Sequence, residues 1–170
     1  SNEVSSNTGY VNAGGTTNNP VAQTFVPTAD HISAMEFYMY KDSTSTDYFE
    51  IEICEDAGGM PGLPYTYGYI YSDDVPMGSV NADWVMCELD SGGADLTPGV
   101  TYWIVINRYD IDFAHYWMVD YDYLYPLGEA YEYDAGPWSG LSFDFMFREY
   151  SALSTGTPST VILNPSNDTT

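Results

Sequence analysis

Short stretches of alternating apolar and polar residues dominate the chain, and no segment repeats apolar residues at the spacing of a helix face. The clearest stretch spans residues 48–54, where three apolar side chains alternate with Glu50 and Glu52. Neighbouring side chains of a strand point to opposite faces, so this segment is predicted to be a half-buried strand with its carboxylates outward. Further strands are predicted at residues 21–26, 31–40, 65–71, 84–89, 100–107, 115–119 and 141–148.

Gly, Pro, Asp and Asn separate these strands, most clearly in the turn-forming residues 57–62 (AGGMPG). Many short strands at this spacing are typical of sandwiches and barrels. The chain is therefore predicted to be all-β, an antiparallel two-sheet β-sandwich that is jelly-roll-like. A closed β-barrel is the alternative that the pattern leaves open.

Both ends of the chain have the composition of flexible arms. Residues 1–20 carry only one charge, and so do residues 151–170. The predicted organisation is a sandwich domain over residues 21–150 between two extended, nearly uncharged arms. A neutral arm can add a strand to the sheet of a second copy, and residues 11–21 are one candidate for that strand. The candidates in the C-terminal arm are Thr160, Val161, Ile162 and Leu163.

Charge narrows the classes of function. Among 170 residues, 3 are Lys or Arg and 25 are Asp or Glu, which gives a formal net charge of -22. Three cations are too few to neutralise phosphate groups. Neither nucleic acid nor an anionic membrane surface is therefore expected as a partner. No apolar stretch approaches the roughly 20 residues of a membrane span, so no membrane insertion is expected. Such an acidic surface favours an extracellular or cell-surface location, where salt or calcium screens carboxylates.

The two cysteines, Cys54 and Cys87, fall in different predicted strands. Alternation places Cys54 on the same face as Glu50 and Glu52, opposite the apolar positions. A cysteine on a polar face favours a disulfide between the two, which an oxidising compartment would allow. Two unpaired, buried thiols are the alternative.

Tyrosines repeat at every second position in two segments. An extended strand puts such residues on one face. Three interpretations stay open: an aromatic layer over the sandwich core, a subunit interface, or a platform on which sugar rings stack. The candidate interface or glycan-contact residues are Tyr65, Tyr67, Tyr69, Tyr71, Tyr121, Tyr123 and Tyr125.

Four aspartates near the tyrosine-rich segments are candidate metal ligands: Asp110, Asp112, Asp120 and Asp122. Calcium takes six to eight oxygen ligands, mainly from carboxylates and carbonyls. A structural Ca²⁺ is therefore the predicted cofactor, and a merely solvated acidic face is the alternative.

Catalytic motifs are missing from the chain. It has no nucleophile elbow, no HExxH and no phosphate-cradling glycine-rich loop. Pairs of carboxylates can be drawn from any sequence this acidic, so they do not indicate a glycosidase. No enzymatic activity is expected, and His115, in a predicted strand, is expected to be a buried, hydrogen-bonded histidine.

Four segments and Trp138 form a recognisable set. The segments are residues 22–27 (AQTFVP), 59–62 (GMPG), 96–105 (LTPGVTYWIV) and 143–148 (FDFMFR). Together they resemble a broad group of secreted prokaryotic β-sandwich modules of cell-surface, appendage and carbohydrate-binding proteins. The resemblance covers residues 21–149 and implies a jelly-roll-like extracellular module used as an appendage, adhesive or sugar-binding unit. It implies no catalytic residues.

Two hypotheses of function follow. The leading one is an extracellular structural protein, the subunit of a cell-surface filament or pilus-like polymer whose copies exchange arms, so that its main partner is itself. The alternative is a carbohydrate-binding or adhesive surface module whose tyrosine-rich faces and acidic loops contact a polysaccharide.

Overall fold

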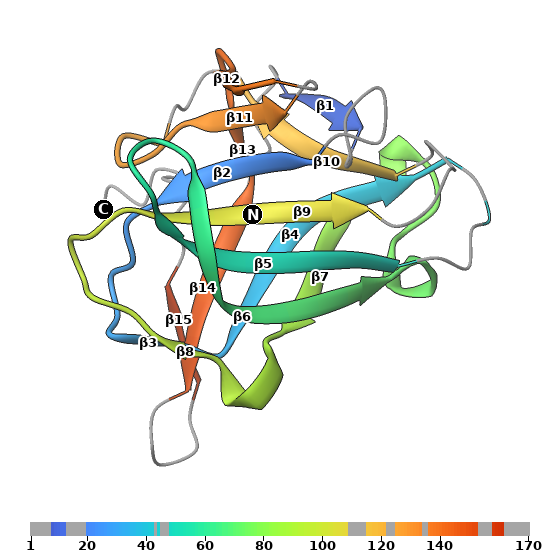
Figure 1. Cartoon of the computed structure of the whole chain (residues 1–170). Helices are drawn as coiled ribbons and strands as arrows, with labels where there is room; N and C mark the ends of the chain where they lie inside the picture. Colours follow the sequence, from blue (N-terminus) through green and yellow to red (C-terminus); the bar gives the residue numbers. More distant parts are fainter. Residues whose placement is uncertain are drawn as a thin grey trace, which may run out of the picture.

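Two antiparallel sheets stacked face to face make up the protein, as the computed structural model shows (Figure 1). The structure describes residues 8–12, 20–42, 44, 48–108, 115–121, 125–133, 136–152 and 158–161, with the main chain alone at 8–12, 108, 120, 152 and 158–161. Within these ranges there is no α-helix, only three short 3-10 turns. The predicted all-β sandwich is therefore confirmed.

The seven-stranded sheet has the order β1-β10-β4-β14-β15, and β13 also pairs with β10. β10 and β14 pair with successive parts of one side of β4, and β7 pairs with its other side. The strands of this sheet are β1 (Thr8–Asn12), β4 (Ala34–Lys41), β7 (Asp83–Glu88), β10 (His115–Asp120), β13 (Asp144–Phe145), β14 (Phe147–Ala152) and β15 (Pro158–Val161). All of these pairings are antiparallel.

The six-stranded sheet has the order β12-β11-β2-β9-β5-β6, so β5 is paired on both sides and β6 is an edge strand. Its strands are β2 (Val21–Phe25), β5 (Tyr48–Asp56), β6 (Pro61–Tyr71), β9 (Tyr102–Arg108), β11 (Ala130–Tyr133) and β12 (Trp138–Gly140). The short strands β3 (His31–Ile32) and β8 (Ala94–Asp95) pair with each other, and the 3-10 turns are η1 (Ser72–Asp74), η2 (Ser79–Asn81) and η3 (Asp90–Gly92).

The chain crosses repeatedly from one sheet of the sandwich to the other. After β2 in the six-stranded sheet it passes to β4, returns for β5 and β6, and crosses again to β7. It then alternates through β9, β10, β11 and β14. Strands that are neighbours in a sheet are consequently distant in sequence, as β2 and β9 are.

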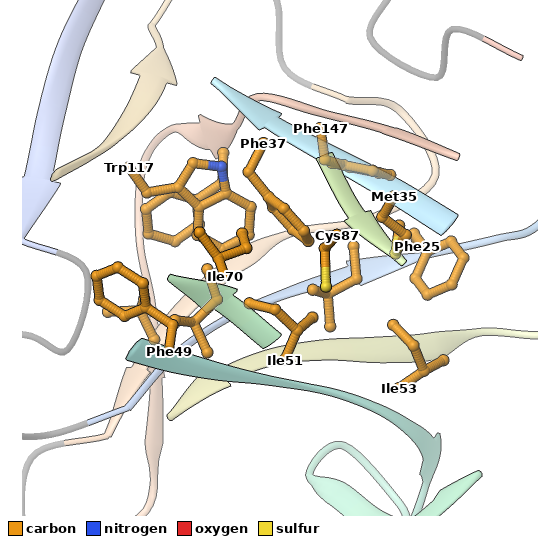
Figure 2. Close-up of a cluster of buried hydrophobic side chains, with 14 of the residues drawn as sticks. Phe25, Met35, Phe37, Phe49, Ile51, Ile53, Ile70, Cys87, Trp117 and Phe147 are labelled. Atoms are coloured by element: carbon orange, nitrogen blue, oxygen red, sulfur yellow. The ribbon is translucent and has the colours of Figure 1, made fainter. Parts of the chain in front are cut away.

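Apolar side chains from the inner faces of both sheets form one core (Figure 2). Phe49, Ile51 and Ile53 point into it from β5, as their alternation predicted. They meet aromatic rings from the other sheet, among which Trp117 stands edge-on to Phe37 at 5.3 Å between ring centroids. Fully burying one such side chain contributes about 1.5–3 kcal/mol, so this layer is the main source of stability.

A glycine lets the two sheets close on each other at one edge. Gly68 of β6 forms an isolated antiparallel bridge with Leu89, which follows β7. A Cβ added at Gly68 would lie 2.5 Å from Cys87 Sγ and 2.8 Å from the main-chain oxygen of Glu88. No larger residue fits without moving the main chain, so Gly68 fixes β6 against the opposite sheet.

Parts of both predicted arms join the seven-stranded sheet of their own chain. Strand β1 pairs with β10, and β15 pairs with β14, where Thr160 lies opposite Tyr150 and Val161 opposite Glu149. An edge strand has unpaired N–H and C=O groups, and the terminal strands satisfy them. Ile162 and Leu163, the other two donor-strand candidates, lie outside the described residues.

A buried carboxyl group lies on the core side of β14. Glu149 is 0% exposed, and its Oε1 accepts hydrogen bonds from the main-chain N–H of Thr28 at 3.0 Å and from Thr28 Oγ1 at 2.6 Å. Its Oε2 has no hydrogen-bond partner. Burial raises the pKa of Glu149, and the two bonds from Thr28 oppose this only in part.

Glu149 should therefore make stability depend on pH. The folded pKa lies above the unfolded value, so the stabilisation is complete below the unfolded pKa and is lost as pH rises through the folded pKa. Each unit of pKa elevation corresponds to about 1.4 kcal/mol. In urea unfolding from mildly acidic to neutral pH, wild type should lose stability relative to Glu149→Gln as pH rises. A difference between the two proteins that stays constant with pH would contradict this role.

Candidate functional site

Exposed tyrosines and carboxylates share the outer face of β5 and β6. Across the hairpin, Glu50 lies opposite Tyr69 and Glu52 opposite Tyr67. The next pair along the two strands is Tyr48 and Tyr71. Residues directly opposite in an antiparallel pair lie on the same side of the sheet. We call this surface the tyrosine face; it consists of Tyr48, Glu50, Glu52, Tyr67, Tyr69 and Tyr71.

The rings of the tyrosine face are open to solvent, and contacts hold those of Tyr69 and Tyr71 in place. Tyr67 and Tyr69 are each 36% exposed, and Tyr71 is 57% exposed. Tyr69 donates a hydrogen bond from its hydroxyl to Glu50 Oε2 at 3.1 Å, and the Tyr48 ring stands edge-on to that of Tyr69 at 5.7 Å. Tyr67, Tyr69 and Tyr71 do not cover the sandwich core, so the interpretation as a core layer is wrong for this row.

Tyr65 departs from the row because the hairpin register shifts. The shift falls between Ile53 and Cys54, which pair with Thr66 and Pro64, so Tyr65 has no direct partner on β5. Its ring packs edge-on against Tyr102 at 5.7 Å between centroids. There it lines an open pocket of about 380 Å³, together with Glu55, Asp56, Val100, Thr101 and Tyr102.

A second aromatic cluster lies on the same side of the six-stranded sheet. Trp103 of β9 lies opposite Cys54, which alternates with Glu52 along β5 and so shares its face. The Trp103 ring packs on Tyr131 at 4.6 Å and on Trp138 at 5.9 Å, and its Nε1 donates a hydrogen bond to Asp56 Oδ1. Trp103 is almost fully buried, so it supports the face and does not contact solvent itself.

The electrostatics keep hydrogen-bond donors and acceptors side by side on this face. Burial, followed by the nearby charge of Glu50, raises the pKa of the Glu52 carboxyl. Burial and the charges of Glu52 and Glu50 raise the pKa of the Tyr67 hydroxyl. The hydrogen bond to Glu50 raises the pKa of the Tyr69 hydroxyl. The phenols therefore stay protonated as donors next to carboxylate acceptors.

The two described members of the second predicted tyrosine row, Tyr121 and Tyr125, differ in exposure. Tyr125 is buried: its hydroxyl donates to the Val26 carbonyl at 3.3 Å, and its ring packs edge-on against Phe147. Its inclusion among the contact residues was wrong, because its ring fills space between the sheets. Tyr121 is 44% exposed and its ring packs against Phe143, whereas Tyr123 lies outside the described residues.

The predicted disulfide is wrong, because Cys54 and Cys87 are both free and buried. Cys54 belongs to the outer cluster around Trp103, whereas Cys87 points into the core between the sheets (Figure 2). The two thiols therefore lie on different sides of the six-stranded sheet. Burial raises the pKa of both thiols to about 12.

The predicted calcium ligands fall where the structure gives no side chains. Asp110, Asp112 and Asp122 lie outside the described residues, and Asp120 of β10 is described by its main chain alone. Elsewhere in the described part of the chain, no three His, Cys, Asp or Glu side chains gather as a metal site. The calcium site stays a prediction.

A buried hydroxyl–imidazole pair lies at the end of β6. The Oγ of Ser72 and the Nε2 of His115 are 2.8 Å apart, and Lys41 Nζ donates to the main-chain oxygen of Ser72. A serine beside a histidine is the start of a nucleophile arrangement. Here both side chains are only 1% exposed and the Phe49 ring packs on His115, so no substrate reaches them. The expectation of a buried, hydrogen-bonded His115 is confirmed.

One sequence pattern could have predicted that Glu50 and Glu52 lie beside the tyrosines. Residues 57–62 predict a turn, and a turn there pairs the outward Glu50 and Glu52 with the tyrosines of the following strand. No sequence pattern predicted that Trp103 supports this face, because the residues it packs on come from β11 and β12, far along the chain.

No protein-family model matches the chain, and no curated protein or solved structure matches it. Among the described residues, no helix has the length and apolar character needed to cross a membrane.

The positions of the cysteines predict that reductant has no effect on stability. Thiol titration in denaturant without reductant should give two free thiols per chain, because Cys54 and Cys87 face different environments. The native protein should react slowly, since a buried thiol with a high pKa forms little thiolate. The melting temperature should be the same with and without reductant. Finding no titratable thiol in denaturant would contradict this assignment.

Proposed function

We propose that the protein is an extracellular carbohydrate-binding module that holds a polysaccharide on the tyrosine face. The observation that carries this proposal is the exposed row Tyr67, Tyr69 and Tyr71 beside Glu50 and Glu52. Flat rings pack against the apolar faces of sugar rings, while carboxylates accept hydrogen bonds from sugar hydroxyls. This combination of ring faces and acceptors suits a carbohydrate better than an apolar ligand.

The geometry favours a chain-like ligand that lies along β6. Alternate residues of a strand are about 7 Å apart, so three tyrosines offer successive contacts along an extended polymer. Tyr69 is held by Glu50 and Tyr48, so its ring loses little freedom when a ligand binds. An extracellular location agrees with this use and with the acidic composition.

Substitutions in the tyrosine row test the proposal directly. Tyr67→Ala and Tyr69→Ala should each weaken binding to the recognised polysaccharide by about tenfold, or about 1.4 kcal/mol, because each removes one stacking surface. Binding is measured by calorimetry after a polysaccharide pull-down screen with wild type. Tyr121→Ala is the matched control, since Tyr121 is similarly exposed but follows β10 of the other sheet. Wild type that binds no polysaccharide in the screen would overturn the proposal.

A filament subunit assembled by strand exchange is the second candidate, and the position of the terminal strands favours it. β1 and β15 lie at opposite ends of the strand order of one sheet and are joined to their neighbours by main-chain pairing. A strand held in this way can be replaced by the same strand of a second copy in the same register. Repetition of that exchange from copy to copy gives a polymer.

Truncation distinguishes strand exchange between copies from terminal strands that pair only within their own chain. Chains lacking residues 1–19 or 153–170 should stay folded but form no polymer in electron micrographs, because they lack β1 or β15. A chain ending at Val161 retains β15 and is the matched control. With 25 acidic residues per copy, the wild-type polymer should become more stable as salt or calcium is added. Polymers formed equally by both truncated chains would rule out exchange.

A further inference from the structure

Acidic groups surround the tyrosine face on several sides. Glu50 and Glu52 lie on β5 directly beside the tyrosines. On the other side of β6, Thr66 Oγ1 donates to the main-chain oxygen of Asp90 at 3.2 Å, which places η3 next to the same strand. The hydrogen bond to Glu50 raises the pKa of the Tyr69 hydroxyl most, and the charges of Glu50 and Asp90 raise it further.

The acidic character continues into the pocket at Tyr65. Glu55 and Asp56 line this pocket together with Tyr65 and Tyr102. Asp56 already accepts hydrogen bonds at Oδ1 from the Trp103 indole and from the main-chain N–H of Gly59, so its position is fixed. These carboxylates add to the negative charge at the Tyr65 end of the same hairpin.

With 3 basic residues against 25 acidic ones, the chain has too few cations to balance its acidic groups. Lys41 is buried and bonded to Ser72, and Arg148 belongs to the other sheet, where it pairs with Glu36 at 3.1 Å and lies 3.8 Å from the Trp84 ring centroid. Arg108 pairs through its main chain with Phe49 of β5 and is described by its main chain alone; it brings one positive charge to a protein of net charge -22. The tyrosine face and its surroundings therefore carry a strong negative potential.

We infer that the glycan held on the tyrosine face is cationic, a polymer of amino sugars with free ammonium groups. This inference rests on the proposed carbohydrate binding and names its ligand class. An ammonium group over a tyrosine ring is attracted by the ring face, and adjacent carboxylates accept its three N–H donors. A negative potential attracts such a polymer and repels the uronic-acid and sulfated polysaccharides that a neutral site would accept.

A matched pair of ligands tests whether the positive charge of the glycan determines how tightly it binds. Calorimetry compares wild-type binding to a glucosamine oligosaccharide and to its fully N-acetylated counterpart of the same length, at mildly acidic pH where the amines are protonated. The glucosamine ligand should bind at least about tenfold more tightly at low salt, and the difference should shrink as salt is added. Equal binding of both ligands, or tighter binding of the N-acetylated one, would overturn the inference and leave carbohydrate binding intact.

Two charge variants locate the contact. E50Q/E52Q removes both charges but keeps the shape of the face, so it should weaken glucosamine binding more than N-acetylated binding and lose most of the preference for glucosamine. D42N/D83N removes the same charge from exposed positions that follow β4 and begin β7 in the other sheet, and it should retain the preference. Equal losses in both variants would mean that net charge alone attracts the ligand, and the assignment to this face would be wrong.

Failure of the proposed carbohydrate binding itself gives a result that differs from failure of the preference for a cationic glycan. A wild-type protein that binds neither oligosaccharide nor any polysaccharide of the screen overturns carbohydrate binding and this inference together. Binding to a lysine-rich peptide in the absence of any glycan binding does the same, and it would identify a basic protein as the partner of the face.

Discussion

The pairing of β5 with strands on both sides is the constraint on which the rest of the structure depends. One face of β5 contributes Phe49, Ile51 and Ile53 to the core, and the other carries Glu50 and Glu52. A shift of register by one residue would exchange these faces, burying two carboxylates and exposing three apolar side chains. The core therefore holds the register, and the register in turn places each carboxylate opposite a tyrosine of β6.

Contacts outside the hairpin keep that face rigid. Gly68 allows β6 to approach the end of β7 so closely that a Cβ would meet Cys87, and this contact anchors the edge strand to the second sheet. Trp103, buried under Tyr131 and Trp138, supports the face from β9. Binding surfaces gain affinity when their side chains are ordered before the ligand arrives, and these contacts provide that order.

Local pattern predicted the features that depend on one strand, and distant pairings decided the rest. Alternation in residues 48–54 predicted both the buried and the exposed side of β5. Tyr65 left the tyrosine row because a register shift depends on the partner strand, and Tyr125 is buried because it fills a space between sheets. The cysteines were misassigned for the same reason: alternation gives the face of a strand, but not what covers that face.

The two proposed functions use different parts of the sandwich, and the net negative charge opposes one of them and favours the other. Strand exchange at the edges of the seven-stranded sheet brings together copies of net charge -22, and the main-chain pairing must overcome their repulsion. A cationic glycan on the six-stranded sheet encounters the same charge as an attraction. Such a polymer would also neutralise the subunits that it joins, so binding on one sheet would lower the barrier to assembly through the other. The acidity that opposes self-association in isolation would then make assembly dependent on the ligand.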